Sequence, residues 1–259
     1  MSLFQSKTEC PRCVQNGADR SGDNLAVYDD HVYCFKCKYY RSSKGTEMTD
    51  ELTTTTPKEF KVLTGSYIDL EDRGVTEKTC RMYGYQVAKI NGKEVHIANY
   101  YQSGELLGQH LRGPNKQFAW RGSAKGLELF GQNLWKAGGK RLIITEGEID
   151  CMTVNQVLGG TWAVVSIPNG ATSAAKSIKE NLEFINSYAE VVLCFDMDEA
   201  GQKATMEVAD LLPPGKCKIA KLPYKDASEC YMNAQTKQLV SALWEAQQYS
   251  PDEIMHISK

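Results

Sequence analysis

The sequence predicts an α/β chain, α+β overall, in which a mainly parallel sheet with flanking helices follows a mixed α+β segment and a small cysteine-rich module. After Lys140, short apolar runs alternate with helical patterns, which is typical of parallel strands covered on both faces. Residues 86–111 read instead as short strands joined by tight turns, and four of the nine cysteines precede residue 40. These observations predict three structured regions.

The composition excludes several classes of protein. Hydrophobic residues make up 42% of the 259 residues and charged residues 24%, close to the averages of soluble globular proteins, which excludes a wholly disordered chain. No apolar run is long enough to span a bilayer, so we expect no membrane partner. The start, MSLFQSKTEC, lacks the features of a secretory signal. We therefore expect a cytoplasmic, reducing setting in which the cysteines are not a disulfide framework.

Shifts in composition predict the boundaries of the domains. Residues 41–60 are polar and rich in threonine, which is typical of a flexible linker. The expected organisation is a cysteine module over 1–40, the linker over 41–60, a basic subdomain over 61–138, the α/β subdomain over 139–249 and a tail over 250–259.

The N-terminal cysteines have the spacing of a metal site. Cys10 and Cys13 form one C-x2-C pair, and Cys34 and Cys37 form another after twenty residues. Two such pairs can complete a tetrahedron of thiolates around structural Zn2+, whose binding would stabilise a module too small to fold by itself. The alternatives are an accidental spacing of free thiols, or His31 as a ligand in place of one cysteine. A plausible hairpin between the pairs would present three side chains to a ligand, namely Asp29, His31 and Tyr33.

The basic subdomain begins with helical signals and continues as strands. The run from Tyr67 to Tyr83 is interrupted at Gly74, so two short helices are expected. Asn91-Gly92 is a favoured hairpin turn, and Ser103-Gly104 provides a second turn. The three strands expected around these turns are Gln86–Ile90, Glu94–Tyr100 and a third that ends at Leu111.

The α/β subdomain is predicted as strands and helices in alternation. The expected strands are Arg141–Thr145, Trp162–Ile167, Glu190–Phe195 and Lys216–Leu222. The expected helices are Glu148–Leu158, Thr172–Ser187, Glu199–Leu212 and Lys237–Gln247. Three scattered cysteines fall inside these or earlier elements and are expected to be packing residues, namely Cys80, Cys151 and Cys194.

Acidic residues follow the predicted strands. Glu146 and Asp150 follow one strand, Asp196 and Asp198 follow another, and Asp226 follows a third. Ligands of open α/β sheets bind outside the carboxyl ends of the strands, and several carboxylates at one edge repel unless cations neutralise them. Oxygen ligands of this kind suit Mg2+, and two such ions suit phosphoryl transfer. Three further acids are assigned mainly to stabilising helix N-termini, namely Glu148, Glu199 and Glu229.

These motifs carry a family resemblance. A strand followed by Glu146-Gly, and a second strand followed by Asp196-x-Asp198, resemble the TOPRIM fold of primases, topoisomerases and some nucleases. The four-cysteine zinc ribbon, the threonine-rich linker and the strings TEGEID, FDMDEAG and KDASEC together resemble the primase half of the T-seven-type bacteriophage primase-helicase family. The resemblance runs from Cys10 to about Trp244.

The resemblance implies a DNA primase, a DNA-directed RNA polymerase that makes short RNA primers. Glu146 would be the general base or metal-positioning acid, supported by Asp150. The implied ligands of Mg2+ or Mn2+ are Glu146, Asp196, Asp198 and Asp226. The zinc ribbon would read a single-stranded DNA template, and the other implied partners are ribonucleoside triphosphates, a DNA polymerase and a replicative helicase, fused or separate.

The segment QHLRGPNKQFAWRGSAKG completes the resemblance. It implies nucleotide-binding lysines at the positions of His110, Lys116 and Lys125, and His110 departs from this pattern. A neutral imidazole binds phosphate more weakly than an ammonium group does, while Arg112 and Arg121 remain candidates for phosphate or template contacts. Phe118 and Trp120 would stack on bases or belong to the core. From 85 to 141 there are nine Lys and Arg against three Glu, a surplus of 9 − 3 = +6 that a neutral total conceals.

Two other functions stay open at the level of the sequence. A TOPRIM nuclease would use the same acids for strand cleavage, whereas a zinc-ribbon recombination mediator that binds single strands would not need the full set. No G-x4-G-K-[ST] loop occurs, so NTP-driven movement along DNA is not expected. The chain ends about where a linker to a helicase would begin, and either a fragment or a stand-alone primase agrees with that.

Overall fold

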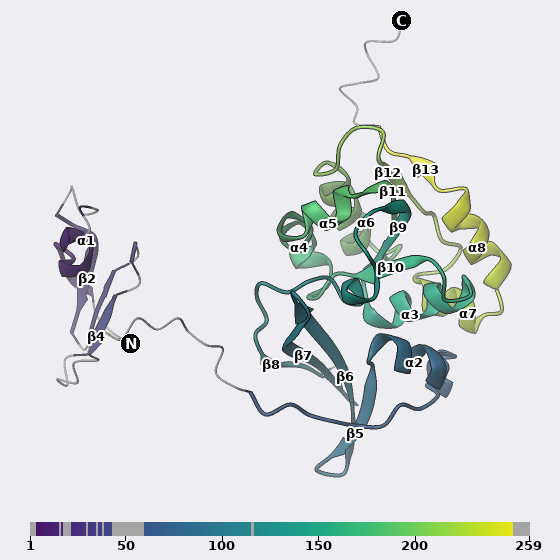
Figure 1. Ribbon diagram of the computed structural model, residues 1–259, viewed down its shortest axis with the longest axis horizontal. Coiled ribbons are helices and arrows are strands. Elements are labelled where there is room, and N and C mark those ends of the chain that lie inside the picture. The colour runs from purple at the N-terminus through teal and green to yellow at the C-terminus, as the bar shows by residue number, and fades with distance from the viewer. Residues whose placement is uncertain are drawn as a thin grey trace, which may run out of the picture. The chain divides into compact units, whose positions relative to one another are not determined.

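The computed structural model describes residues 4–15, 17, 22–29, 31–34, 36–37, 39–42, 60–114 and 117–250. Lys116, most of the expected linker and nearly all of the expected tail lie outside these ranges. The chain forms two compact units, Met1–Thr56 and Pro57–Lys259, each described by itself below (Figure 1). Among the helices of the described residues, none has the length and apolarity needed to span a membrane.

The smaller unit is an antiparallel sheet with one short helix. The strands follow the order β1-β2-β3-β4. Its elements are β1 (Phe4–Thr8), α1 (Pro11–Gln15), β2 (Leu25–Tyr28), β3 (His31–Cys34) and β4 (Tyr40–Ser42). Its core contains Leu25 and three fully buried cysteines. So small a core favours additional stabilisation by a metal ion.

The larger unit contains an antiparallel sheet that matches the expected hairpins. Asn91 and Gly92 both have positive φ, at 51° and 74°, as a two-residue hairpin requires, and the Ser103-Gly104 turn repeats this. The strands β5 (Gln86–Ile90), β6 (Lys93–Gln102), β7 (Glu105–Gly113) and β8 (Gln117–Gly122) follow one another in the sheet. The sequence had suggested only the first three, and β8 adds an edge that carries Phe118 and Trp120.

Of the two helices predicted before this sheet, the first does not form, so that prediction is wrong. The segment contains a single 3-10 turn, η1 (Glu71–Arg73), because the residues before that turn are extended and pair with the sheet. Ser66 exchanges two backbone hydrogen bonds of 2.9 Å with Val87. The second expected helix is α2 (Glu77–Tyr83), which begins after Thr76, whose hydroxyl accepts a hydrogen bond from the Thr79 amide.

A five-stranded sheet forms the centre of the larger unit, in the order β10-β9-β11-β12-β13. The strands are β9 (Gly139–Thr145), β10 (Ala163–Ser166), β11 (Tyr188–Cys194), β12 (Cys217–Ile219) and β13 (Gln247–Gln248). All pairs are parallel except that of β13, an antiparallel edge strand. The mainly parallel sheet predicted from the alternating apolar runs is therefore confirmed.

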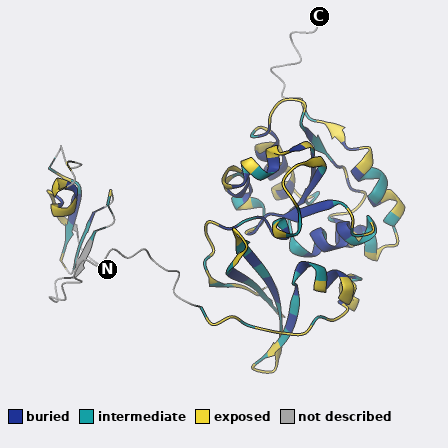
Figure 2. Cartoon of the chain, viewed as in Figure 1, coloured by how far each residue is buried: buried dark blue, intermediate teal, exposed yellow. Residues whose placement is uncertain are grey.

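Helices cover both faces of this sheet (Figures 1 and 2). On one face lie α3 (Glu148–Val157), α7 (Ala227–Met232) and α8 (Thr236–Trp244); on the other lie α4 (Ala174–Glu180), α5 (Leu182–Asn186) and α6 (Glu199–Ala209). Two further 3-10 turns are η3 (Gln132–Leu134) and η4 (Ala171–Ser173). The single helix expected over Thr172–Ser187 is broken at Asn181, whose side-chain amide donates to the carbonyl oxygens of Leu127 and Ser177.

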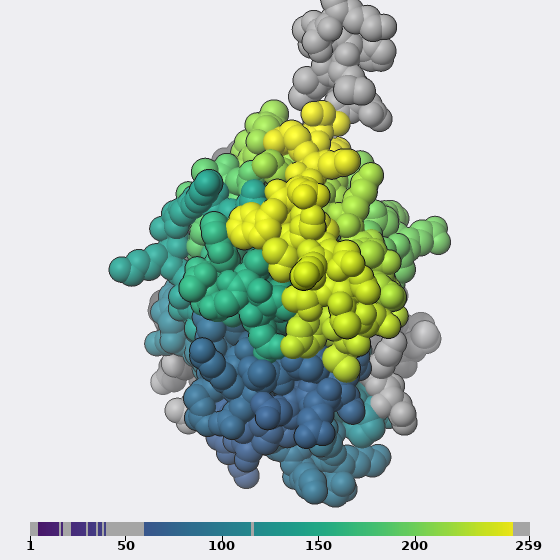
Figure 3. All heavy atoms as spheres, turned by 90° about the vertical axis from the view of Figure 1, so that its right-hand side faces the viewer, coloured from purple at the N-terminus to yellow at the C-terminus, as the bar shows by residue number. Residues whose placement is uncertain are grey.

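The antiparallel sheet and α2 pack against the α3 side of the parallel sheet. Tyr100 of β6 and Met152 of α3 belong to the same buried cluster. Gly74 lies against Tyr231 of α7, and in Figure 3 the blue segments after residue 60 lie directly beside the yellow-green C-terminal helices. This packing places one face of the antiparallel sheet next to the carboxyl ends of the parallel strands.

Candidate active site

The predicted acids gather at the carboxyl edge of the parallel sheet. β9 and β11 are neighbours with Thr145 opposite Cys194, so Glu146 and Asp196 leave adjacent strands side by side. Asp198 caps α6 by accepting a hydrogen bond of 2.9 Å from the Gly201 amide. A side chain at Gly201 would collide with the backbone carbonyl of Asp196, so glycine is needed for this close approach. Asp226 caps α7, accepting from the Glu229 amide at 2.7 Å.

Glu146 lies at the centre of this edge with an unsatisfied oxygen. Its Oε2 is buried and finds no hydrogen-bond partner among the described residues. Burial raises the pKa of Glu146, and the backbone amides of Ala171 and Asp196 offset part of that rise. A buried acceptor without a donor is costly, and a bound cation would satisfy it.

Asp150 and Asp196 both resist ionisation. Burial, followed by repulsion from Asp226, raises the pKa of Asp150 to about 8, although its Oδ1 accepts a hydrogen bond of 2.9 Å from the Ser228 amide. Burial, followed by repulsion from Glu146 and Asp226, raises the pKa of Asp196 to about 7. Each carboxylate thus raises the free energy of ionising its neighbours, which is the electrostatic signature of a site for a cation.

Lys225 supplies a positive charge in the middle of the cluster. Its Nζ lies 3.2 Å from Oδ2 of Asp198 and 3.6 Å from Oδ2 of Asp196. The Gly201 amide and then Lys225 lower the pKa of Asp198, and the two aspartates raise the pKa of Lys225. No role for Lys225 is predicted from the sequence, although its place beside Asp226 in KDASEC is a usable signal.

The chemistry of these donors fits a hard divalent cation, since all are carboxylates and one has an unpartnered buried oxygen. The carboxylates are more widely spread than the cysteines: within the described part of the chain, only the cysteine set places one ligand atom of each residue within 4.8 Å of all the others.

A pocket of about 450 Å3 joins this acidic edge to the antiparallel sheet, a volume within the range of roughly 300–1,000 Å3 found for small-molecule sites. Its walls include the carboxylates Glu146, Asp150 and Asp196 on one side and His110 and Arg112 on the other. Charged groups of both signs therefore face a common space.

His110 is held in this pocket by Glu148, an acid predicted from the sequence mainly to stabilise a helix N-terminus. Its Nδ1 lies 2.6 Å from Oε1 of Glu148, which also accepts a hydrogen bond of 2.8 Å from the Tyr100 hydroxyl. Burial would raise the pKa of Glu148, but its hydrogen bonds, first that with His110, outweigh burial and lower that pKa. Assigning Glu148 mainly to the helix N-terminus was therefore incomplete, because its side chain orients two rings of the facing sheet.

The remaining cationic candidates are not brought together. Arg112 lines the pocket beside His110. Arg121 donates to the Lys61 carbonyl at 3.1 Å. Lys125 lies in a separate recess of about 60 Å3 that also contains Lys176. Lys116 lies outside the described residues, so the structure places two of the four predicted nucleotide-binding side chains at the pocket.

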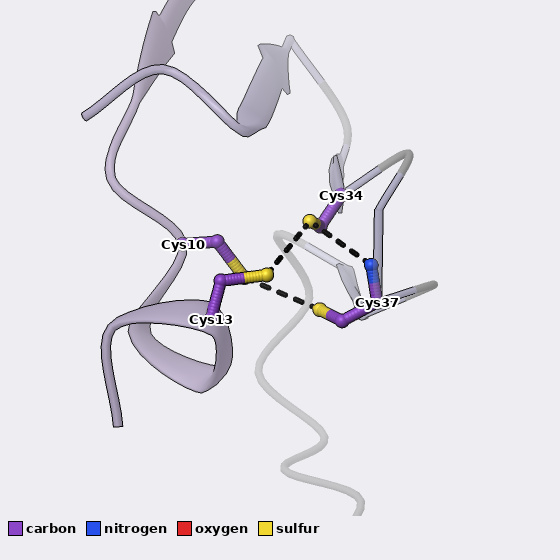
Figure 4. Close-up of side chains that lie close together, drawn as sticks. All are labelled: Cys10, Cys13, Cys34 and Cys37. Carbon is purple, nitrogen blue, oxygen red and sulfur yellow. Dashed lines mark hydrogen bonds between the residues drawn. The ribbon is translucent and has the colours of Figure 1, made fainter. Parts of the chain in front are cut away.

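The four N-terminal cysteines converge in the smaller unit (Figure 4). Sγ of Cys10 lies 3.4 Å from Sγ of Cys37, and Sγ of Cys13 lies 3.6 Å from Sγ of Cys34. A tetrahedron with Zn–S bonds of about 2.3 Å has S–S edges of about 3.8 Å, close to these separations and far beyond a disulfide bond. Burial opposes ionisation of Cys34, but amide groups, first that of Cys37, lower its pKa to about 7. The arrangement is that of a four-cysteine zinc site.

The proposed template-reading residues lie on the β2–β3 hairpin. Asp29 is exposed after β2, while His31 and Tyr33 are half-buried and two residues apart on β3. Side chains two apart on a strand share a face. The His31 ring stacks on that of Tyr28, with centroids 4.5 Å apart. The cysteine set is complete with four members, so His31 is not needed as a ligand.

Comparison with known proteins identifies the two parts of the larger unit. The family described as bacteriophage T7 DNA helicase/primase, N-terminal a+b fold, matches residues 65–122. The Toprim-like family matches residues 143–231. These ranges contain the antiparallel sheet and most of the parallel sheet, respectively.

Two relatives, from phages T3 and T7, extend the match to most of the chain. The DNA helicase/primase of Enterobacteria phage T3 is 35% identical over 267 residues, which cover 98% of this chain and 46% of that protein. The chain thus spans about half the length of this curated relative. The primase fragment of the bacteriophage T7 primase-helicase superposes with a TM-score of 0.69 at 34% identity, covering 93% of this chain and 100% of that fragment.

A second T7 structure contains primase domains with the lagging-strand DNA polymerase, an RNA/DNA hybrid and dTTP. It superposes with a TM-score of 0.68 at 40% identity, covering 71% of this chain and 94% of that chain. The resemblance seen in the sequence motifs is confirmed by both identity and fold. The chain belongs to the primase part of the T7-type bacteriophage primase-helicase family.

Proposed function

We propose that this protein is a DNA primase, a nucleotidyltransferase that copies a single-stranded DNA template into a short RNA from ribonucleoside triphosphates. The observation that carries the proposal is the pocket in which the acidic edge with Glu146 and Asp196 faces the basic sheet with Arg112. Joining two nucleotides needs groups of both signs of charge. Cationic groups bind the phosphates, and carboxylates hold the metal and accept the proton of the reacting hydroxyl.

The reaction transfers a nucleotidyl group. The 3′-hydroxyl of one nucleotide attacks the α-phosphorus of the next, a new P–O bond forms, and the bond to pyrophosphate breaks. Held by Glu146, Asp196, Asp198 and Asp226, Mg2+ or Mn2+ would neutralise the triphosphate and make the hydroxyl more acidic. Glu146, whose pKa is raised by burial, is suited to receive the hydroxyl proton or to position the metal, and Asp150 supports it from the same turn.

In this proposal, the basic side chains of the pocket bind phosphate. Arg112 offers a planar guanidinium to phosphate oxygens, and His110, fixed by Glu148, presents its remaining edge to the same space. Lys125 lies outside this pocket. We therefore assign it to the template or to the growing primer rather than to the reacting triphosphate.

The smaller unit is proposed to select the template. Its zinc-type site stabilises the hairpin that carries Asp29, His31 and Tyr33, and base edges are read by such hydrogen-bonding side chains. The proposed partners beyond template and nucleotides are a replicative helicase and the DNA polymerase that extends the primer. The proposed setting is the reducing cytoplasm, where cysteines that serve as zinc ligands or packing residues persist as thiols.

One incubation separates this function from its rivals. The protein is mixed with single-stranded DNA, Mg2+ and the four ribonucleotides, and labelled products are resolved by length. Short RNA whose sequence follows the template supports the primase. Cut DNA would indicate a TOPRIM nuclease, and binding without any product would indicate a recombination mediator; either result overturns the proposal.

A further inference from the structure

Three aromatic rings form a stack on the antiparallel sheet. Phe118 and Trp120 alternate on β8, and His110 lies on β7 opposite Trp120. The His110 ring is nearly parallel to both neighbours, at 16° to Phe118 and 18° to Trp120, with centroids 5.3 Å and 4.7 Å away. Side chains two apart on a strand share a face, so all three rings lie on the face that lines the pocket.

The stack ends in an exposed ring. Phe118 is 55% exposed, although Trp120, two residues further along β8 on the same face, packs against the core. The guanidinium carbon of Arg112, the cross-strand partner of Phe118, lies 5.9 Å from the ring centroid. An exposed aromatic ring beside a cation is a combination that protein–nucleic acid sites use for a base and its phosphate.

Hydrogen bonds hold the other two rings in place. Trp120 Nε1 donates to Oδ1 of Asn169 at 2.9 Å, and His110 pairs with Glu148. Asn169 follows β10 and Glu148 begins α3, so both anchors come from the parallel-sheet side of the pocket. A ring whose rotation is fixed before binding loses little entropy when a ligand stacks on it.

We propose that Phe118, backed by His110 and Trp120, is a stacking platform for one nucleobase, with Arg112 taking the adjacent phosphate. This inference rests on the proposed primase function and names part of its substrate site. The base belongs either to the single-stranded template or to a ribonucleoside triphosphate, since both present the same planar ring and phosphate. The family resemblance implies a lysine at the position of His110. This chain has there an aromatic ring that extends the stack.

The test compares variants that keep or remove the aromatic face. Phe118→Leu keeps an apolar side chain without a π-system, Phe118→Tyr keeps the ring, and Gln117→Ala is the control on the same strand. Binding is measured with the full chain in Mg2+, for a single-stranded DNA by fluorescence anisotropy and for ATP and GTP by calorimetry. Stacking of one base corresponds to about a tenfold loss of affinity in Phe118→Leu, with Phe118→Tyr and Gln117→Ala near the wild type.

Abasic DNA assigns the effect to a base. If the template base stacks on Phe118, an abasic residue at one position weakens binding by the wild type, and the same lesion has no effect on Phe118→Leu. If the nucleotide base stacks there, the loss appears with ATP and GTP and not with DNA. The platform is overturned if Phe118→Leu binds DNA and both nucleotides as the wild type does. It is also overturned if nucleotide binding is unchanged and the abasic lesion weakens DNA binding by Phe118→Leu as much as it weakens DNA binding by the wild type.

The same measurements separate this inference from the proposed function. A wild type that makes no RNA, yet loses base-dependent affinity in Phe118→Leu, would retain the platform and refute the primase. A wild type that makes RNA, with unchanged affinities in Phe118→Leu, would retain the primase and refute the platform.

Discussion

The ammonium group of Lys225 lies 3.2 Å from Oδ2 of Asp198, at the edge where the carboxylates of the larger unit gather. A lysine here offsets the repulsion among acids that burial and proximity make difficult to ionise. The same aspartate oxygen is a natural ligand for a divalent cation. Lys225 and the metal would therefore compete for Asp198, and this competition makes the acidic edge testable by mutation.

Asp198→Ala should abolish primer synthesis while the fold stays intact. The change removes a proposed metal ligand, and the electrostatic stabilisation lost corresponds to a decrease in rate of at least about a hundredfold. Primer synthesis on single-stranded DNA with Mg2+ measures the effect, and circular dichroism checks the fold. Glu199→Ala, at an exposed carboxylate next along the chain, is the matched control. Retained activity in Asp198→Ala would place the metal site elsewhere.

Lys225→Met should make the metal-free protein less stable and more responsive to Mg2+. Without the ammonium group, Asp196 and Asp198 lose their counter-charge, so we expect thermal unfolding at a lower temperature in Mg2+-free buffer at pH 8. Added Mg2+ should then raise the unfolding temperature of the variant more than that of the wild type. An equal response of both proteins to Mg2+ would show that the lysine and the cation do not share a site.

The stability of the metal-free protein should depend on Asp150 and on pH. The pKa of Asp150 is about 8 in the fold, against about 4 in an unfolded chain. Between these values the folded state binds more protons, so the contribution of Asp150 to the free energy of unfolding decreases as pH rises from about 4 to about 8. Asp150→Asn removes this decrease. The free energy of unfolding of the variant should therefore exceed that of the wild type by about 1 kcal/mol or more at pH 8.

Denaturant unfolding at pH 5, 6, 7 and 8 measures this difference. The buffers contain neither Mg2+ nor a chelator, so that zinc is kept. Glu245→Gln, at an exposed carboxylate that ends α8, provides the comparison and should parallel the wild type. A difference between Asp150→Asn and the wild type that is constant with pH would contradict the raised pKa.

Cys34→Ser should release zinc and remove template selection. Sγ of Cys34 lies 3.6 Å from Sγ of Cys13 within the four-cysteine set, and three remaining thiolates bind zinc much more weakly. We expect template-directed priming to be lost while some untemplated dinucleotide condensation remains, because the acidic edge belongs to the other unit. Elemental analysis gives the zinc content. Cys217→Ala, outside the cluster, should keep it, and an unchanged zinc content in Cys34→Ser would refute the ligand assignment.

Glu148→Ala should destabilise the fold and weaken nucleotide use. Its carboxylate accepts hydrogen bonds from Tyr100 and His110, and removing it leaves both donors unpaired, which costs about 2 kcal/mol. Glu148→Gln keeps an acceptor and should recover most of the stability. KM for ribonucleotides should rise in Glu148→Ala, since the His110 ring is released. An unchanged KM in a variant that remains folded would show that the orientation of His110 does not matter.

Local patterns predicted much of the fold correctly. The apolar runs after Lys140 are strands of a mainly parallel sheet, and the Asn91-Gly92 turn forms the expected hairpin. The errors occur where partners distant in sequence decide the local conformation. The helix expected near Tyr67 is extended because Ser66 pairs with Val87, and the helix after Thr172 breaks where Asn181 reaches Leu127. Neither contact leaves a signal within a window of neighbouring residues.

The candidate site shows the same division. Two C-x2-C pairs and acids placed directly after strands could be recognised from spacing, because both depend on a few residues near one another in the chain. Pairing of His110 with Glu148, 38 residues apart, and the absence of Lys125 from the acidic pocket depend on how the two sheets pack. Residue types and their spacing in the sequence specify which chemistry the chain carries. The tertiary structure decides which groups share a pocket, because burial of the apolar core between the sheets sets the distances across that pocket.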